Sequence, residues 1–237
     1  MTENTCSIQD NIKVVFENVN DACIKSSRNF GDISIMGVSK TKSIEDITKA
    51  IKGGIKLFGE NKVQELVEKD IVFKENNLPC HIIGSLQSNK VKFLPPLTDY
   101  IQSVDSLKLA QEIDKQYCKA GKIANILLEV NIGKEESKGG IAAESLEELL
   151  YAIAELKSVR VKGLMCIPPI CQNDLVRRYF AEMNKLFIDI SHKKVDNVNM
   201  NVLSMGMSHD YMYAIQEGST LVRIGQGVFG QRDYNKI

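Results

Sequence analysis

Short apolar runs alternate with amphipathic helical patterns along most of this chain. The apolar runs begin near residues 33, 55, 81, 100, 123, 159, 200 and 220. Runs of this length between helical patterns are typical of strands in a parallel sheet. Eight strand and helix units, with no linker or repeated block between them, predict an α/β fold, a single (β/α)8 TIM barrel. An open doubly wound sheet is the alternative, because the third and fourth runs are weak.

An additional helix is expected before the first strand. Residues 8–26 place apolar side chains three and four positions apart, at Ile8, Ile12, Val15, Phe16, Val19, Cys23 and Ile24. This spacing predicts an amphipathic helix. We therefore expect one domain over residues 1–237, with residues 1–30 as a helical extension at its N-terminus.

Local signals place the elements that follow the first strand. Ser43 is expected to cap a helix, with Asp46 at the capping-box position. The second strand is predicted over residues 55–58, with residues 59–61 as its loop. The next helix is expected to face the core with Val63, Leu66, Val67 and Ile71.

Composition and charge exclude several classes of protein. Lys and Arg together number 30, as do Asp and Glu, so no field of one sign favours nucleic acid or a membrane surface. We find neither a signal peptide nor an apolar run of membrane-spanning length, and expect a soluble, cytoplasmic protein. The six cysteines form no C-x-x-C pair and the three histidines are dispersed, so neither disulfides nor a metal site is expected.

Lys40 ends the first predicted strand, within the segment from Ile33 to Lys42. Ligands bind at the carboxyl ends of the strands in such barrels, so this lysine has either a chemical role or an ordinary solvated one. The loops after strands seven and eight carry Ser204-Met-Gly-Met-Ser208 and Gly225-Gln-Gly227. These are either ordinary turns or a phosphate site, to which backbone N–H groups and serine hydroxyls would contribute.

A lysine that faces a phosphate site indicates a Schiff base with a phosphorylated carbonyl compound. Two ligand classes fit, namely pyridoxal 5′-phosphate (PLP) and a sugar phosphate in an aldolase. Arg223, on the eighth predicted strand, has three candidate roles: a hydrogen bond to the PLP ring nitrogen, a phosphate contact, or a structural salt bridge to Glu129.

Several segments match the motifs of one known family in the same order. They are Val38–Lys42, Phe58–Asn61, His81–Lys90, Ser137–Gly140, Gly163–Met165, Ser204–Ser208, Gly218–Gly225 and Phe229–Gly230. With them the chain closely resembles the pyridoxal phosphate homeostasis protein family, from about Ile33 to Tyr234. That family's fold is a barrel similar to the N-terminal domain of bacterial alanine racemase.

The resemblance implies a PLP site with assigned roles. Lys40 would form the internal aldimine, Arg223 would lie near the pyridine nitrogen, and Asn61 would line the pocket. The implied phosphate contacts are Ser204, Gly206, Ser208, Gly225 and Gln226.

Two residues depart from the family's usual pattern. Ser85 stands where proline is usual, and His209 where an acidic residue is common. Both affect pocket detail more than ligand identity. Three further lysines fall in family motifs and are either a secondary PLP site or solvated: Lys42, Lys90 and Lys138.

Racemases of this fold use two opposed bases, the lysine and a tyrosine supplied through a second, β-rich domain and a dimer contact. The sequence ends at Ile237 directly after the predicted barrel, so we expect no second domain, no catalytic residues and a monomer. An arginine beside the pyridine nitrogen would also weaken the cofactor as an electron sink. We therefore expect a carrier that takes part in intracellular PLP homeostasis and delivers PLP to apo-enzymes. The alternatives are a small PLP-dependent amino-acid racemase, a Schiff-base aldolase, or an interaction scaffold without cofactor.

Overall fold

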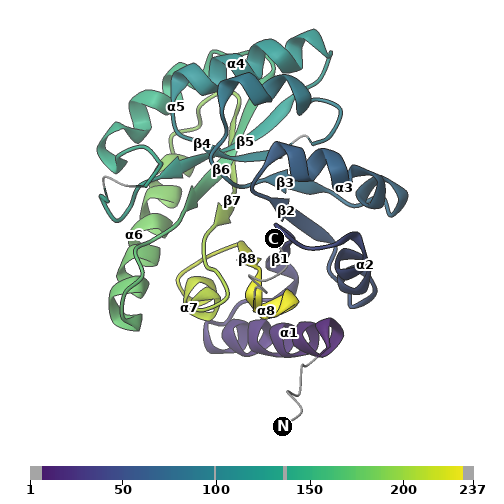
Figure 1. The fold of residues 1–237 in the computed structure, drawn as a ribbon. Helices are drawn as coiled ribbons and strands as arrows, with labels where there is room; N and C mark the ends of the chain where they lie inside the picture. The colour runs from purple at the N-terminus through teal and green to yellow at the C-terminus, as the bar shows by residue number, and fades with distance from the viewer. Residues whose placement is uncertain (1–6, 99, 136–137, 232–237) are drawn as a thin grey trace.

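A closed parallel barrel forms the centre of the molecule (Figure 1). The computed structural model describes residues 7–98, 100–135 and 138–231; Ser137 and Tyr234, named in the motif match, lie outside them. Each strand pairs with its neighbours in the sequence, and the last pairs with the first, so the (β/α)8 barrel is confirmed and the open sheet is excluded. The strands are β1 (Ser34–Val38), β2 (Leu57–Glu60), β3 (Cys80–Ile82), β4 (Tyr100–Val104), β5 (Ala124–Val130), β6 (Val159–Cys166), β7 (Val198–Ser204) and β8 (Leu221–Ile224).

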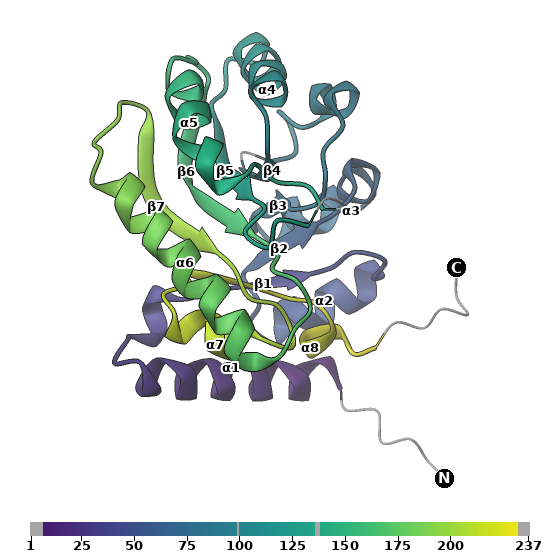
Figure 2. The ribbon, with the colours of Figure 1, turned by 90° about the vertical axis from the view of Figure 1, so that its left-hand side faces the viewer.

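Helices surround this barrel and cover its outer surface (Figures 1 and 2). The main apolar core lies between the strands and the helices. The α-helices are α1 (Ile8–Lys25), α2 (Ile44–Lys52), α3 (Val63–Glu75), α4 (Leu107–Lys119), α5 (Leu146–Ala154), α6 (Asn173–Ser191), α7 (Tyr211–Gln216) and α8 (Gln226–Phe229). The described residues also include the short 3-10 helices η1 (Phe30–Asp32), η2 (Ser88–Phe93) and η3 (Ala143–Ser145).

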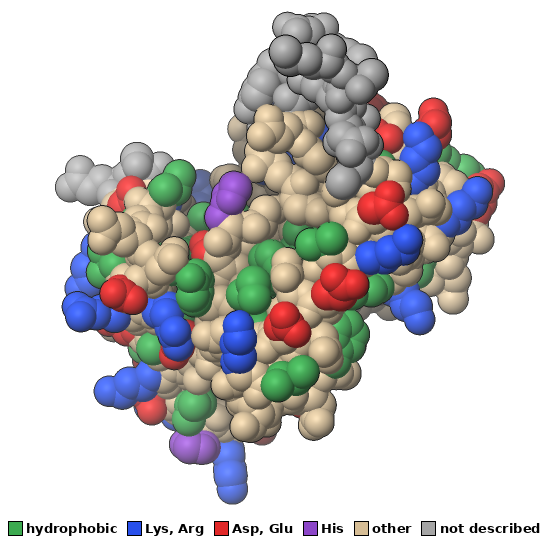
Figure 3. Space-filling model, turned by 90° about the horizontal axis from the view of Figure 1, so that it is seen from below, with side chains coloured by type: hydrophobic (Ala, Val, Ile, Leu, Met, Phe, Trp, Pro, Cys, Tyr) green, Lys and Arg blue, Asp and Glu red, His purple; other side chains and the backbone are tan. Residues whose placement is uncertain are grey.

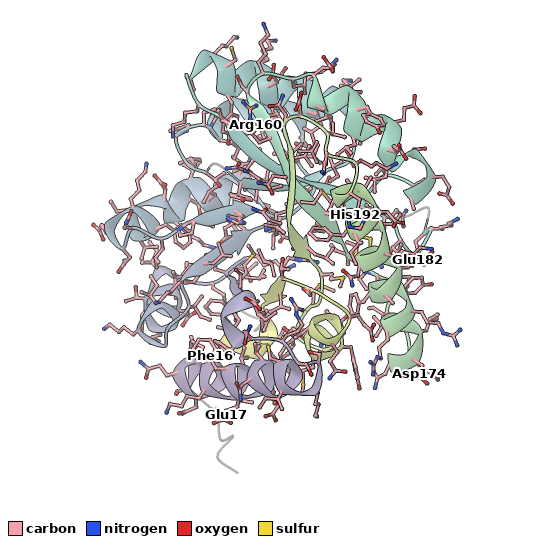
Figure 4. The ribbon with its side chains drawn as sticks, turned by 180° about the vertical axis from the view of Figure 1, so that it is seen from behind. Phe16, Glu17, Arg160, Asp174, Glu182 and His192 are labelled. Carbon is pink, nitrogen blue, oxygen red and sulfur yellow. The ribbon has the colours of Figure 1, made fainter. Side chains whose placement is uncertain are left out.

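The expected N-terminal helix is present and packs across α7 and α8 (Figure 2). Those two helices have only 6 and 4 residues, so α1 covers a side of the barrel that they leave open. The side-chain amide of Asn18 donates to the Tyr211 hydroxyl at 3.0 Å. Figure 4 shows Phe16 on the side of α1 toward the barrel and Glu17 on the outer side. Ile24 was wrongly placed on the buried stripe, because it is 68% exposed.

The sequence prediction needs correction around β2 and α3. The expected cap of α2 is confirmed, since the Ser43 hydroxyl accepts from the amide of Asp46 at 3.1 Å. β2 runs over Leu57–Glu60, two residues later than predicted, so Glu60 belongs to the strand. The predicted face of α3 is half wrong, because Val67 and Ile71 are exposed. The buried face consists of Val63, Leu66, Lys69, Val72 and Phe73.

A small apolar cluster fills part of the barrel interior. Met36 and Val38 of β1 alternate inward and pack with Ile83 and Leu221. Gly59 makes room for this packing, because a Cβ at that position would lie 2.5 Å from the Met36 sulfur. β1 ends at Val38, and the Ser39 amide still donates to the Gly59 carbonyl of β2 at 3.1 Å. Lys40 therefore follows the carboxyl end of β1, where the strand gives way to a turn.

The surface carries both acidic and basic side chains. On the face that Figure 3 shows, acidic and basic side chains are interspersed with apolar ones. The formal net charge of the chain is zero. In the part of the chain that the structure describes, we found no helix with the length and apolar character needed to cross a membrane.

Candidate functional site

Lys40 lies two residues beyond the end of β1, at the mouth formed by the carboxyl ends of the strands. Its side chain is partly buried. Asn61 follows the last residue of β2 and is partly buried as well. The loop after β3 packs directly on it, since a Cβ on Gly84 would lie 2.5 Å from the Asn61 carbonyl oxygen. The ends of the first three strands therefore meet at one mouth, as the barrel prediction requires.

The predicted phosphate loops after β7 and β8 lie against each other. The amide of Gly227 donates to the Ser208 hydroxyl oxygen at 3.1 Å, and the Arg223 amide donates to the Gly206 carbonyl at 3.0 Å. Gly206 has φ +93°, a conformation that favours glycine. A Cβ on Gly225 would lie 3.6 Å from that of Val38, two residues before Lys40. The fold thus brings both loops beside the lysine-bearing end of β1.

Arg223 is buried at the same end of the barrel, with 4% of its surface exposed. Its guanidinium donates to the Ser204 hydroxyl at 2.7 Å and to the Cys166 carbonyl at 2.9 Å. No ion pair joins Arg223 to Glu129 in the described parts of the chain, so the structure does not favour the structural salt bridge. Two neutral acceptors hold the arginine instead, and they fix its direction.

Ser204 is completely buried at the end of β7. Its hydroxyl donates to the Gln102 side-chain oxygen at 2.7 Å and accepts from Arg223. The hydroxyl therefore already has two partners inside the barrel. A phosphate contact from Ser204 stays a prediction, and the structure indicates a further role for this residue in holding Arg223.

A chain of hydrogen bonds through the barrel interior was not foreseen from the sequence. The Gln102 amide lies 2.9 Å from Nδ1 of His81, whose ring stacks on Tyr100 with centroids 4.4 Å apart. The side-chain oxygen of Gln102 accepts from Ser204. The side-chain nitrogen of Gln102 therefore donates to Nδ1 of His81, which accepts. Burial lowers the pKa of His81 to about 3, so the ring is neutral at physiological pH. The chain runs from His81 through Gln102 and Ser204 to Arg223.

The three other motif lysines are scattered around the mouth. Lys42 donates to the Phe229 carbonyl at 3.2 Å, and Lys138 to the Pro168 carbonyl at 3.3 Å. Lys90 is partly buried in η2. A secondary PLP site at any of them stays a prediction. The two departures from the family pattern, Ser85 and His209, are exposed.

Glu129 of β5 is a second ionisable group near Arg223. Burial, then the nearby charge of Asp105, raise the pKa of Glu129 to about 7, although Arg223 acts in the opposite direction. A Cβ on Gly139 would lie 3.8 Å from carboxylate oxygens of both acids. The two carboxylates thus face the same short segment, and Glu129 holds its proton well above the ordinary range of a glutamate.

Glu129→Gln is expected to make stability less dependent on pH. The unfolded glutamate loses its proton near 4.5 and the folded one near 7, so wild-type stability falls as the pH rises between these values. At a pH of about 4 the variant should match the wild type, and at a pH of about 8.5 it should be more stable by about 2 kcal/mol, after a discount for partial exposure. Urea unfolding at both pH values measures this. Glu148→Gln, at an exposed position of α5, is the control. If the stability difference between Glu129→Gln and wild type were the same at both pH values, the raised pKa of Glu129 would be contradicted.

Comparisons with known proteins define the class of this barrel. The family described as alanine racemase, N-terminal domain, matches residues 17–233. Alanine racemase of Clostridium difficile 630 shares the fold with a TM-score of 0.71 at 16% identity, over 96% of this chain and 61% of the racemase chain. The barrel is therefore of the alanine racemase type.

Two more similar proteins specify the family within that class. The pyridoxal phosphate homeostasis protein of Aquifex aeolicus is 41% identical over 232 residues, which cover 98% of this chain and 100% of that protein. PipY of Synechococcus elongatus PCC7942, solved with PLP bound, is 30% identical with a TM-score of 0.79, over 91% of this chain and 100% of the PipY chain. The chain belongs to the pyridoxal phosphate homeostasis protein family.

Proposed function

We propose that this protein binds PLP at the barrel mouth and holds it on Lys40. The Lys40 amine would attack the aldehyde carbon of PLP, and a C=N bond would replace the C=O bond with release of one water. The observation that carries the proposal is the convergence of Lys40, Arg223 and the two glycine-containing loops at one end of the barrel. The PLP bound in PipY supports this choice of ligand over a sugar phosphate.

The loops after β7 and β8 have the donors that a phosphate group needs. The Ser208 oxygen accepts from Gly227, which uses a lone pair of the hydroxyl and leaves its hydrogen for an anion. We propose that Ser208 and the backbone of Gly206, Gly225 and Gln226 bind the phosphate. Asn61 would line the opposite side of the pocket, at the end of β2.

Arg223 favours a protein that holds PLP over an enzyme that uses PLP to transform amino acids. PLP supplies an aldehyde that condenses with amines and a ring that withdraws electrons most strongly when its nitrogen is protonated. A guanidinium has only hydrogen-bond donors, so a ring nitrogen that faces it must accept and stay unprotonated. With Arg223 beside the ring nitrogen, the barrel would bind PLP without making its ring a strong electron-withdrawing group.

We further propose that the protein serves PLP homeostasis by passing the cofactor to apo-enzymes. The amine of an acceptor lysine would attack the C=N carbon, and Lys40 would leave as a free amine. No oxidant or reductant is needed, because one C=N bond replaces another and the acceptor amine takes the place of the Lys40 amine. The relatives of Aquifex aeolicus and Escherichia coli, at 41% and 38% identity, are both named pyridoxal phosphate homeostasis protein, which favours this role over that of an enzyme.

Lys40→Ala is expected to abolish the absorption band that the wild type gains on titration with PLP, because the imine chromophore needs this amine. Lys42→Ala, which changes a neighbouring lysine, should retain the band. Wild type loaded with PLP should restore activity to a cofactor-free PLP enzyme, and loaded Lys40→Ala should do no better than free PLP. Turnover of one amino acid at ~1–10³ s⁻¹ would instead identify a racemase or an aldolase.

A further inference from the structure

A buried lysine on α3 connects this helix to the turn that carries Lys40. Lys69 is 6% exposed, although it is charged and lies on the face of α3 that packs against the strands. Its amine donates to the Glu60 carboxylate at 2.8 Å, to the Glu65 carboxylate at 2.9 Å and to the Ser39 carbonyl at 2.8 Å. The three donors of an ammonium group are thereby all used.

These contacts hold the residues on both sides of Lys40. The residue before it, Ser39, is fully buried, and its hydroxyl donates to Glu60 at 2.7 Å while its carbonyl accepts from Lys69. The residue after it, Thr41, donates its amide hydrogen to the Glu65 carboxylate at 2.6 Å. Glu60, Glu65 and Lys69 thus contact the neighbours of Lys40 on each side.

The turn itself needs such support. The Lys42 amide donates to the Ser39 carbonyl at 3.0 Å, so residues 39–42 form a turn with Lys40 and Thr41 at its centre. Thr41 has φ +63°, and a β-branched residue in this region is strained. Because the strained residue immediately follows Lys40, relaxation of Thr41 would move the Lys40 backbone as well.

We infer that Glu65 and Lys69 of α3 are positioning residues for Lys40, and that they hold the 39–42 turn so that the Lys40 amine reaches PLP. This inference rests on the proposed function. Lysine carries its amine on a flexible four-carbon stem, so the turn that fixes its Cα determines where the amine can reach. Lys69 also holds Glu60 and the wall of the barrel, whereas Glu65 is nearer the surface and mainly holds Thr41. Glu65 is therefore the residue at which positioning can be separated from folding.

The charge of Glu65 agrees with these contacts. Burial acts to raise the pKa of this carboxyl, but the Thr41 amide and Lys69 outweigh burial and lower the pKa below the ordinary value. The group is therefore a carboxylate at neutral pH and accepts both hydrogen bonds. A glutamine at this position would keep one oxygen acceptor, and an alanine would keep none.

The test compares wild type with Glu65→Ala, Glu65→Gln and Glu68→Ala, an exposed position on the same helix. PLP affinity and the rate of imine formation are measured by absorption, and thermal unfolding is measured without PLP. Glu65→Ala should weaken PLP binding about tenfold, equivalent to about 1.4 kcal/mol. Glu65→Gln should recover affinity to within about threefold of wild type, as expected when one acceptor is kept.

The outcomes separate this inference from the proposed function. If wild type forms no imine with PLP, both fail. If wild type binds PLP and Glu65→Ala binds it as tightly as Glu68→Ala does, only the positioning role is overturned. A lower unfolding temperature of Glu65→Ala with unchanged PLP affinity and imine formation would mean that Glu65 is merely structural, and would also overturn the inference.

Discussion

Replacing Lys69 with methionine is expected to lower the free energy of unfolding by about 3–5 kcal/mol. Methionine has similar length but no charge, so the variant leaves the fully buried Glu60 with Ser39 as its remaining partner. One oxygen of Glu60 already lacks a hydrogen-bond partner among the described residues. Burial already raises the pKa of Glu60, and Lys69 is the main group that opposes this. The carboxylate would then have to be buried without its counter-ion.

Urea unfolding measures this loss, with Lys74→Met as the matched control. Lys74 lies on the same helix and pairs with Asp70, but its side chain is 58% exposed, so its removal should cost about 0.5 kcal/mol or less. Equal losses in the two variants would show that Lys69 is not a buried ion-pair partner.

Gly163→Ala is expected to destabilise the barrel by about 3 kcal/mol or more. Gly163 lies on β6 with φ +152°, beside an irregularity in the pairing of β6 with both neighbouring strands. A Cβ there would lie 1.7 Å from the carbonyl oxygen of Val202 on β7. Because that obstacle is strand backbone, it cannot move without opening the pairing of β6 with β7.

Thermal unfolding distinguishes this clash from the general effect of replacing glycine. Gly31→Ala is the control, since nothing lies within 4 Å of a Cβ at that position and it should change stability by about 0.5 kcal/mol at most. Similar unfolding temperatures for the two variants would contradict the close approach of β7 to Gly163.

The order of the strands and the place of Lys40 could be predicted because both depend on local sequence. Apolar runs and helical spacing repeat along the chain, and in a closed parallel barrel every strand end points to one mouth. The loops at Ser208 and Gly225 were placed correctly for the same reason, since each directly follows a predicted strand.

The buried face of α3 could not be predicted because its central member is charged. Apolar spacing selects Val67 and Ile71, which the structure exposes, and passes over Lys69. Lys69 is buried because Glu60 at the end of β2 and the Ser39 carbonyl lie opposite, and Ser39 is 30 residues away in sequence. Glu60 itself belongs to β2 through backbone pairing with β3, although the sequence predicted residues 59–61 as a loop.

The polar chain inside the barrel was missed for a different reason. His81 and Gln102 were both assigned to predicted strands, but a short strand does not reveal which of its alternate faces lies inward. Only the closed barrel brings Gln102 of β4 to Ser204 of β7, which are 102 residues apart. Polar residues within otherwise apolar strands were the available signal.

The most direct test of the proposed function is borohydride reduction of the protein loaded with PLP, followed by peptide mass analysis. Reduction converts an imine to a stable amine, so the phosphopyridoxyl group should be found on the peptide that contains Lys40. The same treatment of Lys40→Ala should leave no such group at the barrel mouth. A wild-type protein whose Lys40 stays unmodified, or whose label lies only on Lys42, Lys90 or Lys138, would contradict the account.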